Sequence, residues 1–192
     1  MSAEPVPKMS PEEYLAFERQ SKEKHEYVDG RVYAMAGATE RHNLVVGNVV
    51  RELGTRLRGK RCRVYPSDMR LQVTETGLYT YPDVMVVCGA RRLADDHRDM
   101  LLNPKVVIEV LSESTEANDR GWKWAHYRYL ESLAEYVMVA QDEPRVEQYV
   151  RQPDGTWLFR EYRSLDDVLR LPSIACEVPL SEIYYVEEMD EE

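Results

Sequence analysis

Two apolar runs on either side of a helical segment place the strongest constraint on this fold. Lys105–Leu111 (KVVIEVL) is nearly all apolar and β-branched, and Glu135–Ala140 (EYVMVA) has the same character. Such runs are typical of strands that are buried on both faces of a sheet. The segment between them, about 116–130, has a helical pattern that Ser112 or Ser114 can cap. This strand–helix–strand crossover predicts an α/β fold around a central sheet.

Two tight turns predict β-hairpins before and after the crossover. Asp29-Gly30 separates two alternating runs within 25–35, and a two-residue Asp-Gly loop is a strong hairpin signal. Pro153-Asp154-Gly155 lies in the same way between the β-prone runs Arg145–Arg151 and Thr156–Tyr162.

Helix-capping residues predict two helices in the N-terminal third. The capping box Ser10-Pro11-Glu12-Glu13 begins a helix that extends to about residue 20. Thr39 can cap a longer helix, and Gly59 would end it. Short β-prone runs follow at 62–65, 69–73 and 81–87, and Leu180–Tyr184 can form a short helix.

The composition is that of a soluble, folded protein. The chain has 192 residues, of which 43% are apolar and 31% charged, and common domains have roughly 100–150 residues. One domain over 1–192 is therefore expected, with its core at about 9–186 and an acidic tail at 187–192. No uncharged stretch approaches the roughly 18 residues that a transmembrane helix needs, so no membrane association is expected.

The three cysteines, Cys62, Cys88 and Cys176, lie far apart and form no CxxC motif. Their odd number and spacing argue against a disulfide framework and against a four-cysteine zinc site. This cysteine usage fits a reducing cytoplasm, and a cytoplasmic location is expected.

The charge is unevenly distributed along the chain. The net charge of −10 weakens a nucleic-acid hypothesis, but Arg51–Arg63 contains six basic residues and one acid, Glu52. A solvated helix face is the more common interpretation of such a run. The tail concentrates acidic charge at the other end of the chain.

Two acids lie in otherwise apolar strands. Glu109 interrupts the run VVIEV, and Asp83 lies near the start of the run 81–87. Buried carboxylates are rare unless they are paired or bind a metal. On neighbouring strands the two acids could project into one pocket and bind a hard divalent cation. Alternatively, Glu109 pairs with an arginine and Asp83 caps a strand.

A series of motifs around these acids resembles the Uma-type restriction endonuclease family of the PD-(D/E)xK nuclease superfamily. The series is Tyr81-Pro82-Asp83-Val84, then Val107-Ile108-Glu109-Val110-Leu111-Ser112, then Ser114-Thr115-Glu116, Asp119-Arg120-Gly121 and Lys123. Upstream, the stretch Glu26–Tyr33 also resembles the family's sequence pattern. The resemblance extends over about residues 9–186, and it rests on the order and spacing of the motifs together.

The resemblance implies a restriction-endonuclease-like fold, with a mixed central β-sheet flanked by helices and with β-hairpin additions. Pro82-Asp83 and Glu109 match the superfamily pattern. Leu111 stands where that pattern has its lysine, so Lys123 on the following helix is the matching candidate.

The implied activity is hydrolysis of DNA phosphodiester bonds with Mg²⁺ or Mn²⁺. Asp83, Glu109 and the carbonyl oxygen of Val110 are the candidate metal ligands. Lys123 would orient the attacking water or neutralise charge on the phosphate. Glu26 is a secondary candidate for a metal or water ligand, although an exposed strand residue is its more common role.

DNA contacts are expected from the basic run and from one histidine. The run continues the long helix into the strands that lead to Asp83, so we expect it at the rim of the active-site cleft. His42, near a helix start, could contact a phosphate, although such histidines are more often caps or surface groups. The expected phosphate contacts are Arg56, Arg58, Lys60, Arg61 and His42.

A homodimer is expected because cleavage of both strands needs two active sites and twofold dimers are common. The aromatic residues of the second hairpin could form the interface, or could close the core: Tyr149, Trp157, Phe159 and Tyr162. Two other functions stay open. One is a catalytically weak nuclease-like domain that binds nucleic acid or a protein partner, and the other is a structural dimerisation module.

Overall fold

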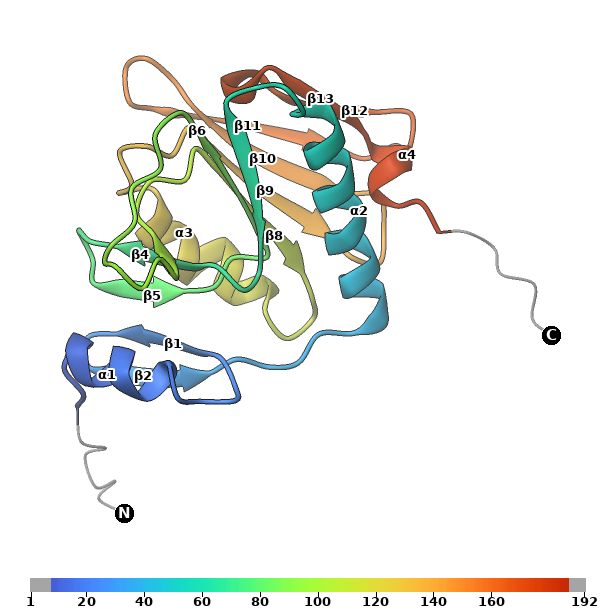
Figure 1. Cartoon of the computed structure of the whole chain (residues 1–192). Coiled ribbons are helices and arrows are strands. Elements are labelled where there is room, and N and C mark those ends of the chain that lie inside the picture. Colours follow the sequence, from blue (N-terminus) through green and yellow to red (C-terminus); the bar gives the residue numbers. More distant parts are fainter. Residues whose placement is uncertain (1–7, 187–192) are drawn as a thin grey trace.

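A six-stranded mixed sheet forms the centre of the computed structural model, in which residues 8–186 are described (Figure 1). Its strand order is β11-β10-β9-β8-β6-β3. β8 and β9 are parallel, which confirms the predicted crossover. The strands are β3 (Cys62–Pro66), β6 (Val84–Cys88), β8 (Val106–Leu111), β9 (Glu135–Ala140), β10 (Val146–Arg151) and β11 (Trp157–Tyr162).

A second sheet has the strand order β2-β1-β5-β4-β7. The predicted Asp-Gly hairpin provides two of its strands, and its turn residues have the positive φ angles that a tight hairpin needs, 50° at Asp29 and 82° at Gly30. The strand expected at 69–73 belongs to this sheet and not to the central one. The strands are β1 (His25–Val28), β2 (Arg31–Ala34), β4 (Arg70–Val73), β5 (Leu78–Thr80) and β7 (Met100–Leu101); β5 and β7 are too short to stand out in the sequence.

Both predicted N-terminal helix caps are confirmed. In α1 (Pro11–Glu18), Ser10 and Glu13 form the reciprocal capping box. In α2 (Glu40–Arg56), the Thr39 hydroxyl accepts a hydrogen bond from the backbone N–H of His42. These caps fix the point at which each helix begins, and for α2 that point lies beside the candidate site.

The helix expected at about 116–130 is shorter and contains a π-helical turn, η1 (Asn118–Lys123), followed by α3 (Trp124–Tyr127). The predicted serine cap is wrong, because the Ser112 hydroxyl bonds to the hydroxyls of Ser114 and Thr115. Single π turns inside α-helices occur frequently at functional sites.

Each face of the central sheet is covered by a different set of elements. Valines and leucines of α2 pack on one face together with β12 (Val168–Leu171), η2 (Pro172–Ile174), β13 (Cys176–Pro179) and α4 (Leu180–Ile183). η1, α3 and residues of the second sheet pack on the other face. No helix within residues 8–186 is both long and apolar enough to cross a bilayer. The acidic tail at 187–192 lies outside the described residues.

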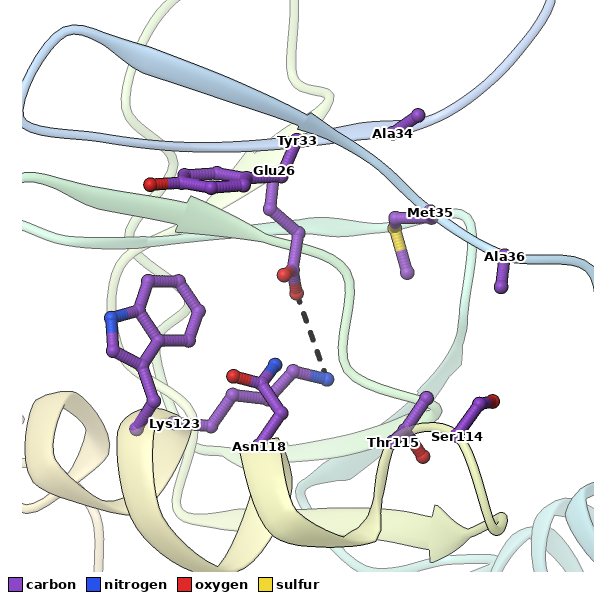
Figure 2. Close-up of a pocket in the computed structure, with 10 residues that line it drawn as sticks. Glu26, Tyr33, Ala34, Met35, Ala36, Ser114, Thr115, Asn118 and Lys123 are labelled. Atoms are coloured by element: carbon purple, nitrogen blue, oxygen red, sulfur yellow. Dashed lines mark ion pairs between the residues drawn. The ribbon is translucent and has the colours of Figure 1, made fainter. Parts of the chain in front are cut away.

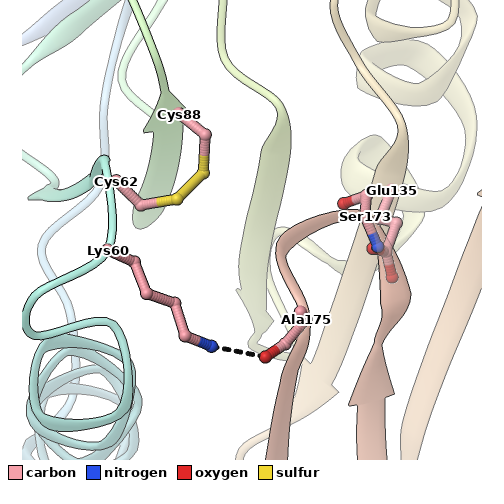
Figure 3. The surroundings of a disulfide bond; sticks show 6 residues. All are labelled: Lys60, Cys62, Cys88, Glu135, Ser173 and Ala175. Carbon is pink, nitrogen blue, oxygen red and sulfur yellow. Dashed lines mark hydrogen bonds between the residues drawn. A yellow bond between two sulfur atoms is a disulfide. The ribbon is translucent and has the colours of Figure 1, made fainter.

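The cysteine prediction is corrected by the pairing of β3 with β6. These antiparallel strands place Cys62 directly opposite Cys88, and the two form a disulfide (Figure 3). Cys176 is free and buried. The sequence separation of 26 residues carries no signal for this pair, because only the strand register brings the two side chains together. The argument from cysteine usage to a reducing compartment therefore loses its support.

Candidate functional site

The two predicted acids lie side by side on neighbouring strands. Glu109 is in the middle of β8 and is 2% exposed, and Asp83 immediately precedes β6. Glu109 Oε2 accepts a hydrogen bond of 3.2 Å from the backbone N–H of Asp83. In turn, Asp83 Oδ2 accepts one of 2.7 Å from the backbone N–H of Val110. The backbone of the sheet thus holds two carboxylates together.

Lys123 extends from η1 into a cluster of carboxylates. Its Nζ lies 3.1 Å from Glu109 Oε1 and 2.9 Å from Asp119 Oδ1. It also lies 3.6 Å from Glu26 Oε1, and Figure 2 shows this ion pair. Burial lowers the pKa of this lysine, but the three carboxylates more than offset that effect and raise it. Lys123 is therefore a buried ammonium ion, and the expected approach to Glu109 is realised.

Glu109 is almost wholly buried. Burial raises its pKa, and the nearby Lys123 ammonium opposes this shift. Its Oε1 accepts a second hydrogen bond of 2.7 Å from the Tyr127 hydroxyl. Removing either donor would leave a buried carboxylate with fewer partners, which is costly.

Glu26 comes to the cluster from the second sheet. It is 8% exposed, so the common role as an exposed strand residue is wrong here. Its Oε1 accepts a 2.5 Å hydrogen bond from the Thr80 hydroxyl on the neighbouring strand β5. The site therefore joins both sheets and the π turn.

Asp119 and Tyr127 are site residues that the sequence did not reveal. Asp119 is 1% exposed and pairs with Lys123 four residues later; burial raises its pKa. Tyr127 is wholly buried, and its hydroxyl donates the hydrogen bond to Glu109. The available signal was the spacing of four residues from Asp119 to Lys123 and again to Tyr127, which places all three on one helix face.

Comparisons with known proteins identify the family of this chain. The Uma2 family, described as "Putative restriction endonuclease", matches residues 11–181. The chain belongs to the Uma2 family. A curated relative from Synechocystis sp., "Uncharacterized protein slr1290", is 38% identical and covers 94% of this chain and 93% of its own length. A second from the same organism, "Uncharacterized protein sll1609", is 36% identical over 78% of this chain and 84% of its own length.

A solved structure shares the fold. It is the crystal structure of "a putative nuclease belonging to DUF820" from Anabaena variabilis, with a TM-score of 0.74 and 17% identity. The match covers 90% of this chain and 96% of the Anabaena chain. The restriction-endonuclease-like fold inferred from the motifs is thereby confirmed.

His42 contacts the acid pair of this Uma2 protein from the first turn of α2. Its Nε2 lies 3.3 Å from Asp83 Oδ2. Burial lowers the pKa of the imidazole, but Asp83 more than compensates and raises it. Its Nδ1 is buried and has no hydrogen-bond partner among residues 8–186. His42 therefore lies beside Asp83, and its contact with a phosphate stays a prediction.

The donor set fits a magnesium ion. Among residues 8–186, no group of three or more His, Cys, Asp or Glu is arranged to hold a metal, but Mg²⁺ commonly uses one or two carboxylates and keeps several waters. Asp83 and Glu109 supply two. The N–H of Val110 points to Asp83, and since the N–H and C=O of a strand residue point to the same side, its carbonyl faces the acids as well.

A cavity of about 550 Å³ opens onto these groups. Its lining includes Asp83, Glu109, Val110 and Lys123, together with the segment Met35–Ala38 between β2 and α2. Carboxylates, a carbonyl and an ammonium ion therefore face one space that solvent and a phosphodiester can enter.

The basic run does not lie at the rim of this cavity, and that prediction is wrong. His42 is in the first turn of α2, whereas Arg56 is at its last residue, roughly 21 Å further along the helix axis. Antiparallel pairing places Cys62 beside Cys88, at the end of β6 away from Asp83. Arg56 pairs with Glu52, and Lys60 donates to the carbonyl of Ala175; Arg58 and Arg61 are exposed at the same end.

The aromatic residues of the second hairpin divide between the two expected roles. Tyr149 stacks on Trp124 with a ring-centroid distance of 4.6 Å, and Trp157 packs edge-on against Trp124. Tyr162 packs against the core on the other face. Phe159 is 47% exposed. Three of the four thus help close the core, and the homodimer stays a prediction.

Proposed function

We propose that this protein is a metal-dependent endonuclease that hydrolyses DNA phosphodiester bonds. The observation that carries the proposal is the pair of carboxylates, Asp83 and Glu109, held by backbone amides beside a buried lysine in one open cavity. Two carboxylates and a lysine serve phosphodiester hydrolysis because the reaction needs charge neutralisation and an oriented water.

Each residue has a distinct part in this proposal. Asp83, Glu109 and the Val110 carbonyl would hold Mg²⁺ or Mn²⁺, which polarises the phosphate and lowers the pKa of bound water when it is present. Lys123 keeps its proton because three carboxylates surround it, so it stabilises negative charge on the phosphate and does not act as a base.

Two further groups assist at the edge of the site. Glu26 is oriented by the Thr80 hydroxyl and can accept a hydrogen bond from a water molecule near Lys123. His42 is held by Asp83 and can donate a hydrogen bond to a phosphate oxygen. Neither residue needs to move far, because both already line or adjoin the cavity.

A second candidate function is a nuclease-like domain that binds nucleic acid or a protein but cuts slowly. Both oxygens of Glu109 already accept hydrogen bonds, and Lys123 is 6% exposed among three carboxylates. These contacts compete with a metal and with substrate, which favours slow turnover.

Cleavage of supercoiled plasmid and of single-stranded circular DNA at low salt, each with Mg²⁺ or Mn²⁺, tests the proposal. We expect the wild type to cut DNA and Asp83→Asn not to. We also expect millimolar metal to raise the melting temperature of the wild type but not that of Asp83→Asn, by mass action. The matched control is Asp68→Asn, since the Asp68 side chain is 89% exposed and pairs only with Lys24. A wild type that neither cleaves nor responds to metal supports the second candidate.

A further inference from the structure

A second cavity adjoins the acid site on the other side of Lys123. It also has a volume of about 550 Å³ and lies between the β1–β2 hairpin and η1, as Figure 2 shows. Both cavities are lined by Met35, Ala36, Ser114, Thr115 and Lys123. The two therefore meet along a common wall, and a ligand in the second cavity would lie next to a phosphate in the first.

The lining of this second cavity is mainly apolar and aromatic. Tyr33 on β2 is 43% exposed, and Trp122 on η1 faces it at a ring-centroid distance of 6.4 Å and an interplanar angle of 61°. Ala34 and Met35 extend the apolar wall, and the Asn118 side chain adds an amide. Glu26, Ser114, Thr115 and Lys123 also line the cavity. Aromatic faces beside several hydrogen-bonding groups are suited to a flat, hydrogen-bonding ring.

Few cations are available to bind a DNA duplex around the two cavities. Of the basic residues other than histidine that line them, Lys24 pairs with Asp68 and Lys123 is buried among carboxylates. The exposed basic run lies at the far end of α2. Many proteins bind duplex DNA by neutralising several backbone phosphates with basic side chains. The two cavities offer few basic side chains for such contacts.

We propose that the second cavity binds one unpaired nucleobase next to the scissile phosphate, so that the substrate is single-stranded DNA. This inference rests on the proposed function and names its substrate class. A base in a duplex is stacked and paired and cannot enter such a cavity without being extruded. An unpaired base can stack on Tyr33 or Trp122, and base–aromatic stacking contributes affinity that does not depend on sequence.

Binding of fluorescein-labelled oligothymidylate to the full chain tests the proposal. Fluorescence anisotropy is measured in millimolar Ca²⁺ and compared with a duplex of the same length. We expect tighter binding of the single strand, and about a tenfold loss of that affinity in Tyr33→Ala and in Trp122→Ala. Trp122→Phe keeps an aromatic face and should recover most of the affinity.

The matched control is Tyr129→Ala, because Tyr129 is 52% exposed and lines neither cavity; its affinity should equal that of the wild type. Tyr33 is an exposed residue of an edge strand, so its removal tests the cavity even if Trp122→Ala unfolds. The proposal is overturned if the duplex binds as tightly as the single strand, or if Tyr33→Ala behaves like Tyr129→Ala.

Cleavage assays separate this inference from the proposed activity. If the single strand binds in a Tyr33-dependent way but no DNA is cut with Mg²⁺ or Mn²⁺, the hydrolysis proposal fails and the cavity assignment stands. If duplex plasmid is cut and Tyr33→Ala changes neither affinity nor rate, the activity stands and the cavity assignment fails.

Discussion

The two ends of helix α2 lie in opposite electrostatic environments. Beside its first turn, His42 contacts Asp83, and the nearby carboxylates of Glu109 and Asp119 are almost wholly buried. Beyond its last turn, the basic residues Arg58 to Arg63 are exposed and lie near the disulfide. The basic run that stands out in the sequence therefore lies away from the candidate site.

This difference teaches that burial sets the energetic importance of a charge. An exposed ion pair contributes about 0–1 kcal/mol, whereas loss of one partner from a buried charge cluster costs about 3–5 kcal/mol. Counting charges along the chain cannot distinguish the two cases. Substitutions at the two ends of α2 should distinguish an exposed charge from a buried one.

The largest effect is expected from Lys123→Met, which leaves Glu109, Asp119 and Glu26 without their shared cation. We expect the free energy of unfolding at pH 7 to fall by about 3–5 kcal/mol, as measured by urea denaturation. The control is Lys60→Met at the other end of α2, which should change it by less than about 0.5 kcal/mol. Equal losses in the two variants would mean that the cluster is not the buried charge network that its contacts indicate.

An intermediate effect is expected from the disulfide. Reduction of Cys62–Cys88, which closes a loop with a sequence separation of 26, should lower the free energy of unfolding by about 2–4 kcal/mol. Cleavage by the folded protein should stay unchanged, because Cys88 and Asp83 lie at opposite ends of β6. Urea denaturation and plasmid nicking with and without dithiothreitol measure the two quantities.

The double variant Cys62→Ser with Cys88→Ser is the control for this comparison. Its stability should not respond to dithiothreitol, since the remaining Cys176 is unpaired. If reduction abolished cleavage while the protein stayed folded, the two ends of β6 would be coupled, and their separation as independent regions would be wrong.

The smallest effect is expected from Arg58→Gln combined with Lys60→Gln. Because these residues lie beyond the far end of α2, cleavage of a short oligonucleotide should change by less than about twofold and keep its salt dependence. Initial rates at several salt concentrations provide the measurement. A large fall in rate together with a flatter salt dependence would show that DNA extends along the whole of α2.

The sequence predicted those features that depend on local chemistry or on short spacing. The hairpin at Asp29-Gly30 and the cap at Thr39 follow from backbone conformation and from a hydroxyl near free N–H groups, and both are present. The run around Glu109 marked a buried strand with one anomalous acid, and that strand is β8. Asp83 was found as a second acid in an apolar run and Lys123 through the motif order, and both lie beside Glu109.

The tertiary structure decided everything that depends on register and on the direction of elements. Strand pairing alone brought Cys62 to Cys88 and sent the basic run away from Asp83. The π turn placed Asp119, and α3 placed Tyr127, around Lys123 and Glu109. The second sheet supplied Glu26 and Tyr33. The sequence by itself determined which residue types were present and which local elements they form. Which residues contact one another across the fold was decided by the packing of the sheets and helices. Contacts between distant segments leave no periodic pattern in the sequence from which they could be predicted.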